Sequence, residues 1–301
     1  GPGITAYAFL QSSNFNHVHV YVDGVSITNL GANYSEIQLI PARIIERIEI
    51  VKGSASAAWG SALAGVINVT TKSPDKNRAI GGAVSASIGE RSTSDSSAEL
   101  SGSSGRLGYY LSGGFLGSAG LMPNTQISAP SAHARLTWDL PGSGQLHALI
   151  NRSESRQGDL FIPAYDLKEF QDKSLLLAAI GLNKPLTERL DLEFNVRHSF
   201  LKGRITWLNI SDGLTWQPTL PVGIYSEQVS SAGVKLIWRG VNNLLVAGGD
   251  FNYLKTINNP EDSSNYSPYN RSPAWWSAST TSRPTPGTSA GHCCTAGRRC
   301  R

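Results

Sequence analysis

The chain has 301 residues, of which only 16% are charged, and its formal net charge is +4. That charged fraction lies below the roughly 25% of typical soluble domains, and no stretch approaches the ~20 apolar residues that a membrane helix requires. This composition excludes a helical membrane protein and leaves a secreted all-β protein or a membrane β-barrel. Five arginines after Asp262 account for the basic excess. We therefore expect no nucleic-acid-binding surface.

The first predicted elements are short strands. Residues 18–27 predict a hairpin, because their Asp-Gly dipeptide favours the type I′ turn, in which both central residues have positive φ. Pro41 opens a predicted helical turn that passes into a strand at 46–53. A linker rich in small residues then leads to a β-branched strand at 65–72.

A long series of alternating strands follows. Residues 131–140 alternate without exception, with Ala, Leu and Trp on one face and polar or charged residues on the other. Residues 189–200 and 231–238 repeat this pattern. A sandwich also alternates, but here Arg, Asp, Glu and His occupy the middle of long strands. This favours a barrel whose outer face meets lipid and whose interior is polar.

The connections give a second signal, because tight turns and longer loops alternate along the chain. We predict tight turns at 104–105, 141–144, 185–188 and 240–243, and longer loops at 118–130, 157–171 and 203–225. Short periplasmic turns and long extracellular loops are typical of outer-membrane barrels. Nine strands are predicted, and such barrels close with an even number. We therefore expect an incomplete barrel with an unpaired last edge.

Three separated segments carry a family resemblance. VYVDGV, IPARIIERIEIVKGSASAAWGS and AGVINVTTKSP resemble, in order and spacing, the plug domain of TonB-dependent outer-membrane receptors. Ser54, Trp59 and Ala64 depart from the Pro, Tyr and Gly that are common in this family. The resemblance covers residues 18–74. It implies an all-β chain with a small α/β plug remnant and a partial transmembrane antiparallel barrel, about nine strands of a plugged 22-strand type.

The resemblance also implies three regions. We expect the C-terminal part of a plug domain at 1–77 and the N-terminal strands of the barrel at 78–256. Residues 257–301 would be a loop and a tail of non-native appearance. From about Arg271 the tail has no acidic residue, no Lys and no alternation, and it holds all three cysteines. Such composition arises when a GC-rich gene is read out of frame, so we expect a frameshift, with a disordered tail as the alternative.

The implied function is uptake of an iron–siderophore complex or similar metal chelate across the bacterial outer membrane. We expect this chain, which is incomplete, to be non-functional alone. TonB would supply the energy through an N-terminal box that we take to be missing, and outer-membrane lipid would surround the barrel. Cobalamin is the alternative ligand, and a general porin or adhesin is the alternative function, although a porin has no plug motif. No HExxH motif or CxxC pair occurs. We expect no enzyme, no cofactor and no metal site.

Two sets of candidate site residues follow from the resemblance. The charges of Glu46, Arg47, Glu49 and Lys52 would lock the plug to the barrel wall or would simply be solvated. Wall partners for such a lock would be lumen-facing residues such as Arg135, Asp191, Glu193 or Arg197. The full plug-motif set is Asp23, Gly24, Glu46, Arg47, Glu49, Lys52, Gly53, Gly60, Gly65 and Asn68. The ligand-binding candidates, whose aromatic members could instead form an interface girdle, are Asn33, Tyr34, Phe161, Tyr165, Trp207, Trp216 and Tyr225.

Overall fold

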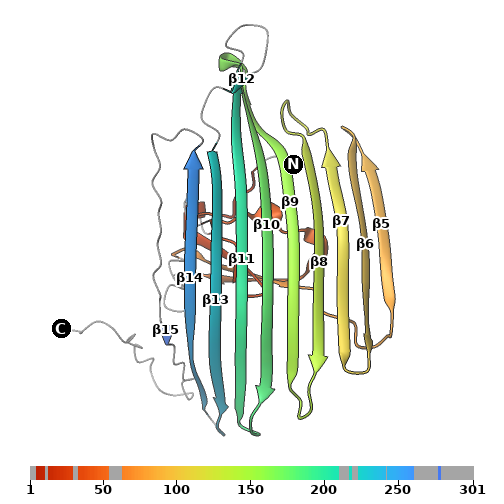
Figure 1. The fold of residues 1–301 in the computed structure, drawn as a ribbon, viewed down its shortest axis with the longest axis vertical. Coiled ribbons are helices and arrows are strands. Elements are labelled where there is room, and N and C mark those ends of the chain that lie inside the picture. The colour runs from red at the N-terminus through yellow and green to blue at the C-terminus, as the bar shows by residue number, and fades with distance from the viewer. Residues whose placement is uncertain are drawn as a thin grey trace, which may run out of the picture.

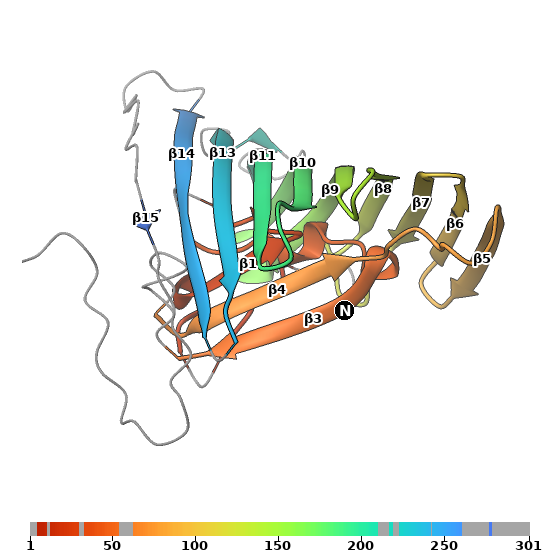
Figure 2. The same cartoon turned by 90° about the horizontal axis from the view of Figure 1, so that it is seen from below.

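The protein folds into two β-sheets that lie against each other in the computed structural model (Figures 1 and 2). The structure describes residues 5–10, 13–29, 33–53, 63–209, 217–218, 223–241, 243–260 and 277–278. Within them no helix is long and apolar enough to cross a membrane. Gly60, Trp216 and the tail from Arg271, apart from the backbone of a two-residue strand, lie outside the described residues.

The smaller sheet, which we call the plug sheet, contains four strands. They are β1 (Val18–Val22), β2 (Val25–Ser26), β3 (Ile45–Lys52) and β4 (Gly65–Thr71), in the order β2-β1-β4-β3. The β1 and β4 strands are parallel, whereas β2 and β3 pair antiparallel to their neighbours. Three 3-10 turns accompany the sheet: η1 (Phe15–His17), η2 (Ile37–Leu39) and η3 (Ala42–Ile44). The predicted helical turn after Pro41 is the third of these.

The larger sheet, which we call the wall, contains nine long antiparallel strands in chain order among the described residues. They are β5 (Gly81–Gly89), β6 (Thr93–Ser104), β7 (Leu107–Ser118), β8 (Ile127–Asp139), β9 (Gln145–Ile162), β10 (Leu167–Pro185), β11 (Leu190–Asn209), β13 (Gly223–Arg239) and β14 (Leu244–Pro260). Two-residue strands β12 (Gln217–Pro218) and β15 (Ser277–Ala278) pair with β11 and β14. The predicted number of strands is therefore confirmed.

The predicted longer loops are too long. Instead of a loop over 157–171, β9 runs to Ile162 and β10 begins at Leu167, and a 3-10 turn, η4 (Pro163–Tyr165), joins them. The two strands stay paired beyond their strongly alternating part, as far as Leu167 opposite Ile162. Asp166 adopts a left-handed conformation that closes this hairpin.

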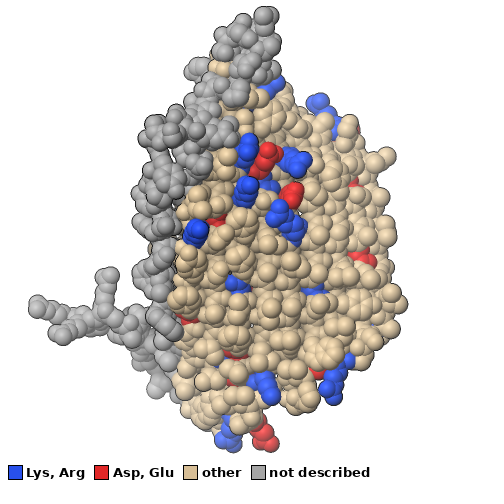
Figure 3. Space-filling model, viewed as in Figure 1, with Lys and Arg blue, Asp and Glu red and all other residues tan. Residues whose placement is uncertain are grey.

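The two faces of the wall differ. The outer face carries exposed apolar side chains in a broad band, and charges are concentrated toward its two ends (Figure 3). We predicted a polar inner face, but the inner face of β9, β10 and β11 is partly apolar because it packs against the plug sheet. The buried apolar cluster at this contact consists of Val20, Val22, Val25, Ile27, Leu39, Val69, Leu149, Leu175, Leu177, Ala179 and Leu201.

Candidate functional site: the interface between plug and wall

The tip of the β1–β2 hairpin reaches the wall. Asp23 and Gly24 have φ values of 48° and 78°, as a type I′ turn requires. Asp23 accepts hydrogen bonds from the Thr71 main-chain N–H and, at 2.6 Å, from the Thr71 hydroxyl. These bonds fix the Asp23 carboxylate at the edge of the plug sheet, where it faces β8.

Two wall arginines hold this tip. Arg135 Nη1 on β8 lies 3.1 Å from Asp23 Oδ1, and the two side chains are 17% and 8% exposed. Arg197 Nη1 on β11 donates to the Gly24 carbonyl at 2.7 Å, and its Nη2 pairs with Asp250 on β14 at 2.9 Å. One hairpin turn is thus bound by charged donors from two different strands of the wall.

A second contact is centred on Glu36, whose side chain is fully buried. Lys173 Nζ on β10 lies 2.9 Å from Glu36 Oε2, and the Gln38 amide donates to the same oxygen. The Tyr34 and Tyr225 hydroxyls donate to Glu36 Oε1 at 2.8 Å and 3.2 Å. Burial and the nearby Glu36 carboxylate raise the pKa of the Tyr34 hydroxyl, so it remains a donor. Both carboxylate oxygens are therefore satisfied, which a buried charge requires.

More exposed ion pairs join the plug region to the first wall strands. Arg43 of η3 lies 2.8 Å from Asp95 on β6 and also donates to the Ser96 carbonyl. Lys72 pairs with Glu99 on β6 at 2.8 Å. Pairs with this much exposure contribute little stability individually. The Glu36 and Asp23 contacts therefore dominate the polar part of this interface.

At the loop end of the wall, polar inner-face residues form a ladder on β9 and β10. Gln171 donates to Asp159 at 2.9 Å and also to Glu169. The Thr5 main-chain N–H donates to Asp159 at 2.6 Å, so the first described segment is bound to this ladder. Two neighbouring carboxylates, Asp159 and Glu169, make this part of the lumen acidic.

Four aromatic rings lie together in the plug region beside this ladder. Tyr7 lies 4.4 Å from Phe15 and 5.4 Å from Tyr34, and Phe9 lies 5.8 Å from Phe15, between ring centroids. Tyr7 and Phe9 remain 41% and 61% exposed. Exposed rings beside fixed polar groups are typical of a surface that binds an organic ligand.

The structure places the predicted charges of β3 away from the described wall. Glu46 accepts from the Ser73 N–H, and Arg47 pairs with Glu49 at 3.4 Å. Lys52 is exposed at the end of β3. Among the described residues the plug–wall ion pairs come from elsewhere in the plug region, so a lock made by β3 stays a prediction.

Among the described residues, two of the predicted wall partners contact the plug, and the other two form ion pairs within the wall. Arg135 and Arg197 hold the hairpin tip, whereas Asp191 and Glu193 pair with the wall residues Arg239 and Lys235.

The other plug-motif residues occupy turns and strand β4. Gly53 has a φ of 89° and follows β3 directly. Gly65 has a φ of 145° and begins β4, where a Cβ would collide with the Val51 carbonyl oxygen. Asn68 pairs in register with Tyr21 and Glu49 in the middle of the sheet. Glycine is therefore favoured at positions 53 and 65 because of the backbone conformation there.

The predicted ligand-binding residues lie in different parts of the structure and do not form one site. Tyr34 and Tyr225 meet at Glu36, and Trp207 lies on β11 in register with Glu169. Phe161 lies on β9, where its ring is 5.7 Å from Lys168 Nζ. The remaining described members are Asn33, which donates to the Asn16 carbonyl, and Tyr165, whose backbone forms part of η4.

The sequence reasoning missed Glu36, Lys173, Asp159 and Glu169. Lys173 carried a readable signal, because it is a lone cation beside the apolar run of β10. Glu36 carried none, since it follows an irregular segment without periodicity. Within the described part of the chain, no group of three or more His, Cys, Asp or Glu side chains is placed to hold a metal ion.

Comparison with known proteins identifies the plug region. Residues 2–66 match the TonB-dependent receptor plug domain. The vitamin B12 transporter BtuB of Vibrio vulnificus strain CMCP6 is 39% identical over 127 residues, which cover 42% of this chain and 20% of that protein. BtuB of strain YJ016 is 42% identical over 72 residues, covering 24% of this chain and 12% of that protein. The match therefore spans a fifth or less of these relatives.

The fold agrees with solved receptors. The hemophore receptor HasR of Serratia marcescens superposes with a TM-score of 0.65 at 16% identity, over 84% of this chain and 39% of that chain. The pyoverdine receptor FpvA of Pseudomonas aeruginosa gives 0.65 at 14% identity, over 89% and 44%. At such identities the likeness concerns the fold, a plug sheet inside an outer-membrane barrel wall. Residues 2–66 therefore carry the plug domain of TonB-dependent receptors, and the strands that follow have the fold of the barrel wall in such receptors.

Proposed function

We propose that the protein is an uptake receptor that carries a metal chelate across the outer membrane with energy supplied through TonB. The observation that supports this best is the plug sheet seated on the inner face of the wall and held there by Asp23–Arg135 and Glu36–Lys173. A general porin or adhesin has no use for a plug fixed across its lumen. A plug that must be displaced, in contrast, requires an energy source.

The regions of the chain each have their own role in this proposal. We propose that residues 1–77 block the lumen and that residues 78–256 form part of the wall. The predicted boundary at 257 falls inside β14, which continues to Pro260, so the loop and the tail begin after that strand. The polar contacts suit a reversible block, because they can be exchanged for water when the plug moves in an aqueous lumen. The apolar cluster between plug and wall would instead oppose the displacement of β1 and β2.

The chelate is an iron–siderophore complex or cobalamin. Asp159 and Glu169 line the upper lumen, and the buried Lys173 is neutralised by Glu36. This lining disfavours a chelate with several negative charges and favours a neutral or cationic one. Cobalamin is a specific second candidate because the relatives at 39% and 42% identity are vitamin B12 transporters. The exposed rings of Tyr7 and Phe9 offer the apolar contact that either ligand needs.

Growth on a single chelate tests the proposal. A strain that lacks its own receptors would carry the full-length gene rather than this chain alone, and would depend on one iron–siderophore complex for iron or on cobalamin for a required vitamin. We expect growth on at least one chelate, and no growth when TonB is also deleted. Failure on every chelate, or growth that persists without TonB, would contradict the proposal.

A binding measurement separates recognition from transport. Tyr7→Ala with Phe9→Ala should weaken chelate binding to the purified receptor, because both rings are exposed. Leu121→Ala, at another exposed apolar side chain in the connection between β7 and β8, is the matched control. An equal loss of chelate affinity in both variants would show that the aromatic rings are not part of the ligand site.

A further inference from the structure

A group of basic side chains lies on the outer face of the wall, toward its loop end (Figure 3). It consists of Arg152 and Arg156 on β9, Lys168 on β10, and Lys202 and Arg204 on β11, and we call it the basic patch. The strand register brings these residues together. In the strand register, Asp172 on β10 lies opposite Arg156 of β9 on one side and opposite Arg204 of β11 on the other.

The patch carries a surplus of positive charge. Glu154 pairs with Arg152 at 2.9 Å. Asp172 is the other acidic residue between these strands, although it forms no ion pair within 4 Å among the residues that the structure describes. Arg156, Lys202 and Arg204 are all exposed and likewise have no ion-pair partner in the described ranges. Three cations are therefore available to an external anion.

The patch lies where the apolar band of the wall ends. On the outer face of β11, apolar side chains run from Leu190 to Phe200, interrupted only by His198, and Lys202 follows. Ten residues of a tilted strand rise about 25 Å, which is the height of the lipid-facing band of such barrels. The tight turns mark the periplasmic end, so the patch faces the headgroups of the outer leaflet.

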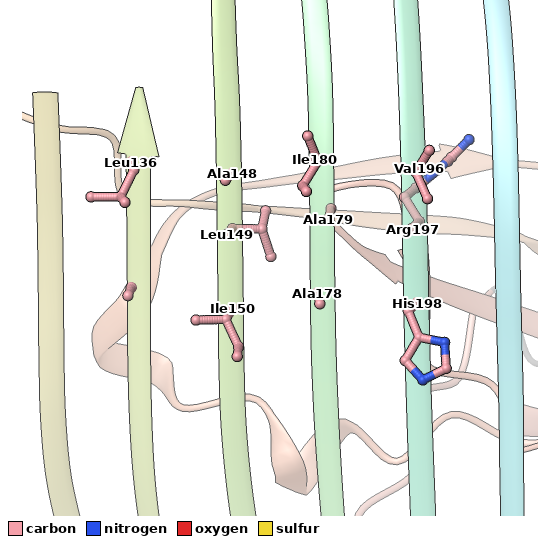
Figure 4. A pocket seen from close by; sticks show the side chains of 11 residues that line it. Leu136, Ala148, Leu149, Ile150, Ala178, Ala179, Ile180, Val196, Arg197 and His198 are labelled. Atoms are coloured by element: carbon pink, nitrogen blue, oxygen red, sulfur yellow. The ribbon is translucent and has the colours of Figure 1, made fainter. Parts of the chain in front are cut away.

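The same strands also carry a shallow apolar depression, which Figure 4 shows from close by. Its volume is about 340 Å³. Ala134, Ala148 and Ala178 supply small side chains there, and Ile150 and Ile180 are larger neighbours that are 50% and 56% exposed. Three alanines on adjacent strands leave a hollow in a surface that otherwise carries larger apolar residues.

The depression and the patch are aligned along the strands. Ile150 precedes Arg152 by one position on the outer face of β9, and Ala178 lies six residues from Asp172 on β10. Six residues of a strand span about 20 Å. An acyl chain extends over such a distance, so one lipid molecule can occupy both features.

We propose that the basic patch and the alanine depression together form a site for one outer-leaflet lipid with a phosphorylated headgroup. Arg156 and Arg204 bind phosphate oxygens through their planar guanidinium groups. Lys202, two residues from Arg204 on β11, adds a point charge beside them. The Ser174 hydroxyl, in register with Lys202, is an additional hydrogen-bonding group. One acyl chain lies in the depression. The inference rests on the outer-membrane location of the wall and is independent of the uptake proposal.

Lipid retention by the purified receptor tests the site. The probe is lipid A, a bisphosphorylated glucosamine lipid, added to receptor in phosphatidylcholine nanodiscs, with bound lipid measured by native mass spectrometry. Each basic residue near an anionic lipid contributes about fivefold in affinity, so Arg156→Gln with Lys202→Gln and Arg204→Gln should lose on the order of 100-fold. Arg156→Lys with Arg204→Lys, which retains the charge, should keep most of the binding.

A matched control removes the same charge elsewhere. Arg106→Gln, Lys184→Gln and Arg189→Gln lie at the tight-turn end of the wall and should leave lipid A binding unchanged. Ala178→Phe fills the depression and should weaken binding without changing the charge. The thermal unfolding of each variant, measured in parallel, separates loss of the site from loss of the fold.

Three results would overturn the proposal. The first is equal binding of lipid A and of the same lipid after removal of its phosphates. The second is an equal loss of affinity in the patch and control variants when both are folded. The third is displacement of lipid A by millimolar inorganic phosphate, which would indicate a site for a soluble anion.

Discussion

Glu36 in the plug region and Lys173 on strand β10 form an ion pair across 2.9 Å, and their side chains are 0% and 1% exposed. Burying two charges costs several kcal/mol each, and their mutual attraction offsets this only when the remaining polar atoms are satisfied. Tyr34, Tyr225 and Gln38 supply the further hydrogen bonds to the carboxylate. The pair therefore specifies where the plug sits on the wall more than it adds stability.

Breaking this pair from one side should be more harmful than removing both charges. Glu36→Gln leaves Lys173 charged and buried, and Lys173→Met leaves Glu36 in the same condition, so each should cost about 3–5 kcal/mol. The double variant should cost clearly less than the sum. Urea unfolding of the receptor in detergent gives the three values, and strictly additive losses would show that the two residues are not coupled.

The hairpin tip offers a second test. Ala at Gly24 would have to adopt a φ of 78°, which costs about 1–2 kcal/mol, and its Cβ would lie 3.1 Å from Arg197 Nη1. Gly24→Ala should therefore loosen the hairpin from β11. Gly105→Ala, in a wall turn with a φ of 58° and no atom near its Cβ, carries the strain without the contact.

Hydrogen exchange of the main-chain N–H groups in β1 and β2 measures this loosening. Exchange should increase in Gly24→Ala and remain at the wild-type rate in Gly105→Ala. The same increase in both variants would assign the effect to general destabilisation of the receptor.

The outer face of the wall should reject charge near its middle. Ile180 is 56% exposed on the outer face of β10, so Ile180→Lys should cost about 2–4 kcal/mol in a bilayer. Asn252→Lys on the inner face of β14 should cost little, because that side chain faces the lumen. Folding yields into lipid vesicles under a urea gradient compare the two. Equal costs would contradict the assignment of the faces.

Much of the wall could be predicted because its strands alternate. Period-two patterns such as the one from Leu190 to Phe200 are sufficient to predict nine strands and their outer faces. Strand ends were harder, since β9 and β10 continue above the lipid with polar residues on both faces, which reads as a loop. The ladder hydrogen bonds between main chains extend them regardless of side-chain pattern.

Most plug–wall contacts could not be predicted from the sequence, because they join residues that are far apart in the chain. The Asp-Gly turn could be predicted from its local backbone requirement, but its two arginines are 112 and 173 residues away. The charged strand β3 stood out through its pattern, whereas the buried charge at Glu36 had no pattern at all. Inward-facing Leu175 and Leu177 also break the polar-lumen rule, since the plug sheet covers them.

His19 gives the plug a pH dependence. This imidazole lies on β1 at 9% exposure, and burial lowers its pKa below the ordinary value of about 6.5. The unfolded chain therefore binds a proton more readily than the folded plug does. Stability from the neutral imidazole is fully present above about pH 6.5 and is lost as the pH falls from there toward the folded-state pKa. Hydrogen exchange of β1 and β4 between pH 7.5 and 5, corrected for the intrinsic exchange rate, should show progressively weaker protection.

The variant His19→Gln isolates this contribution from the other histidines. It should be less stable than the wild type at pH 7.5 if the replacement packs poorly, but its protection should fall less steeply below pH 6.5. His17→Gln, which replaces an exposed imidazole just before β1, provides the matched control for the substitution itself. If His19→Gln retains the full pH dependence, the proton is taken up elsewhere and the burial of His19 has no consequence in this range.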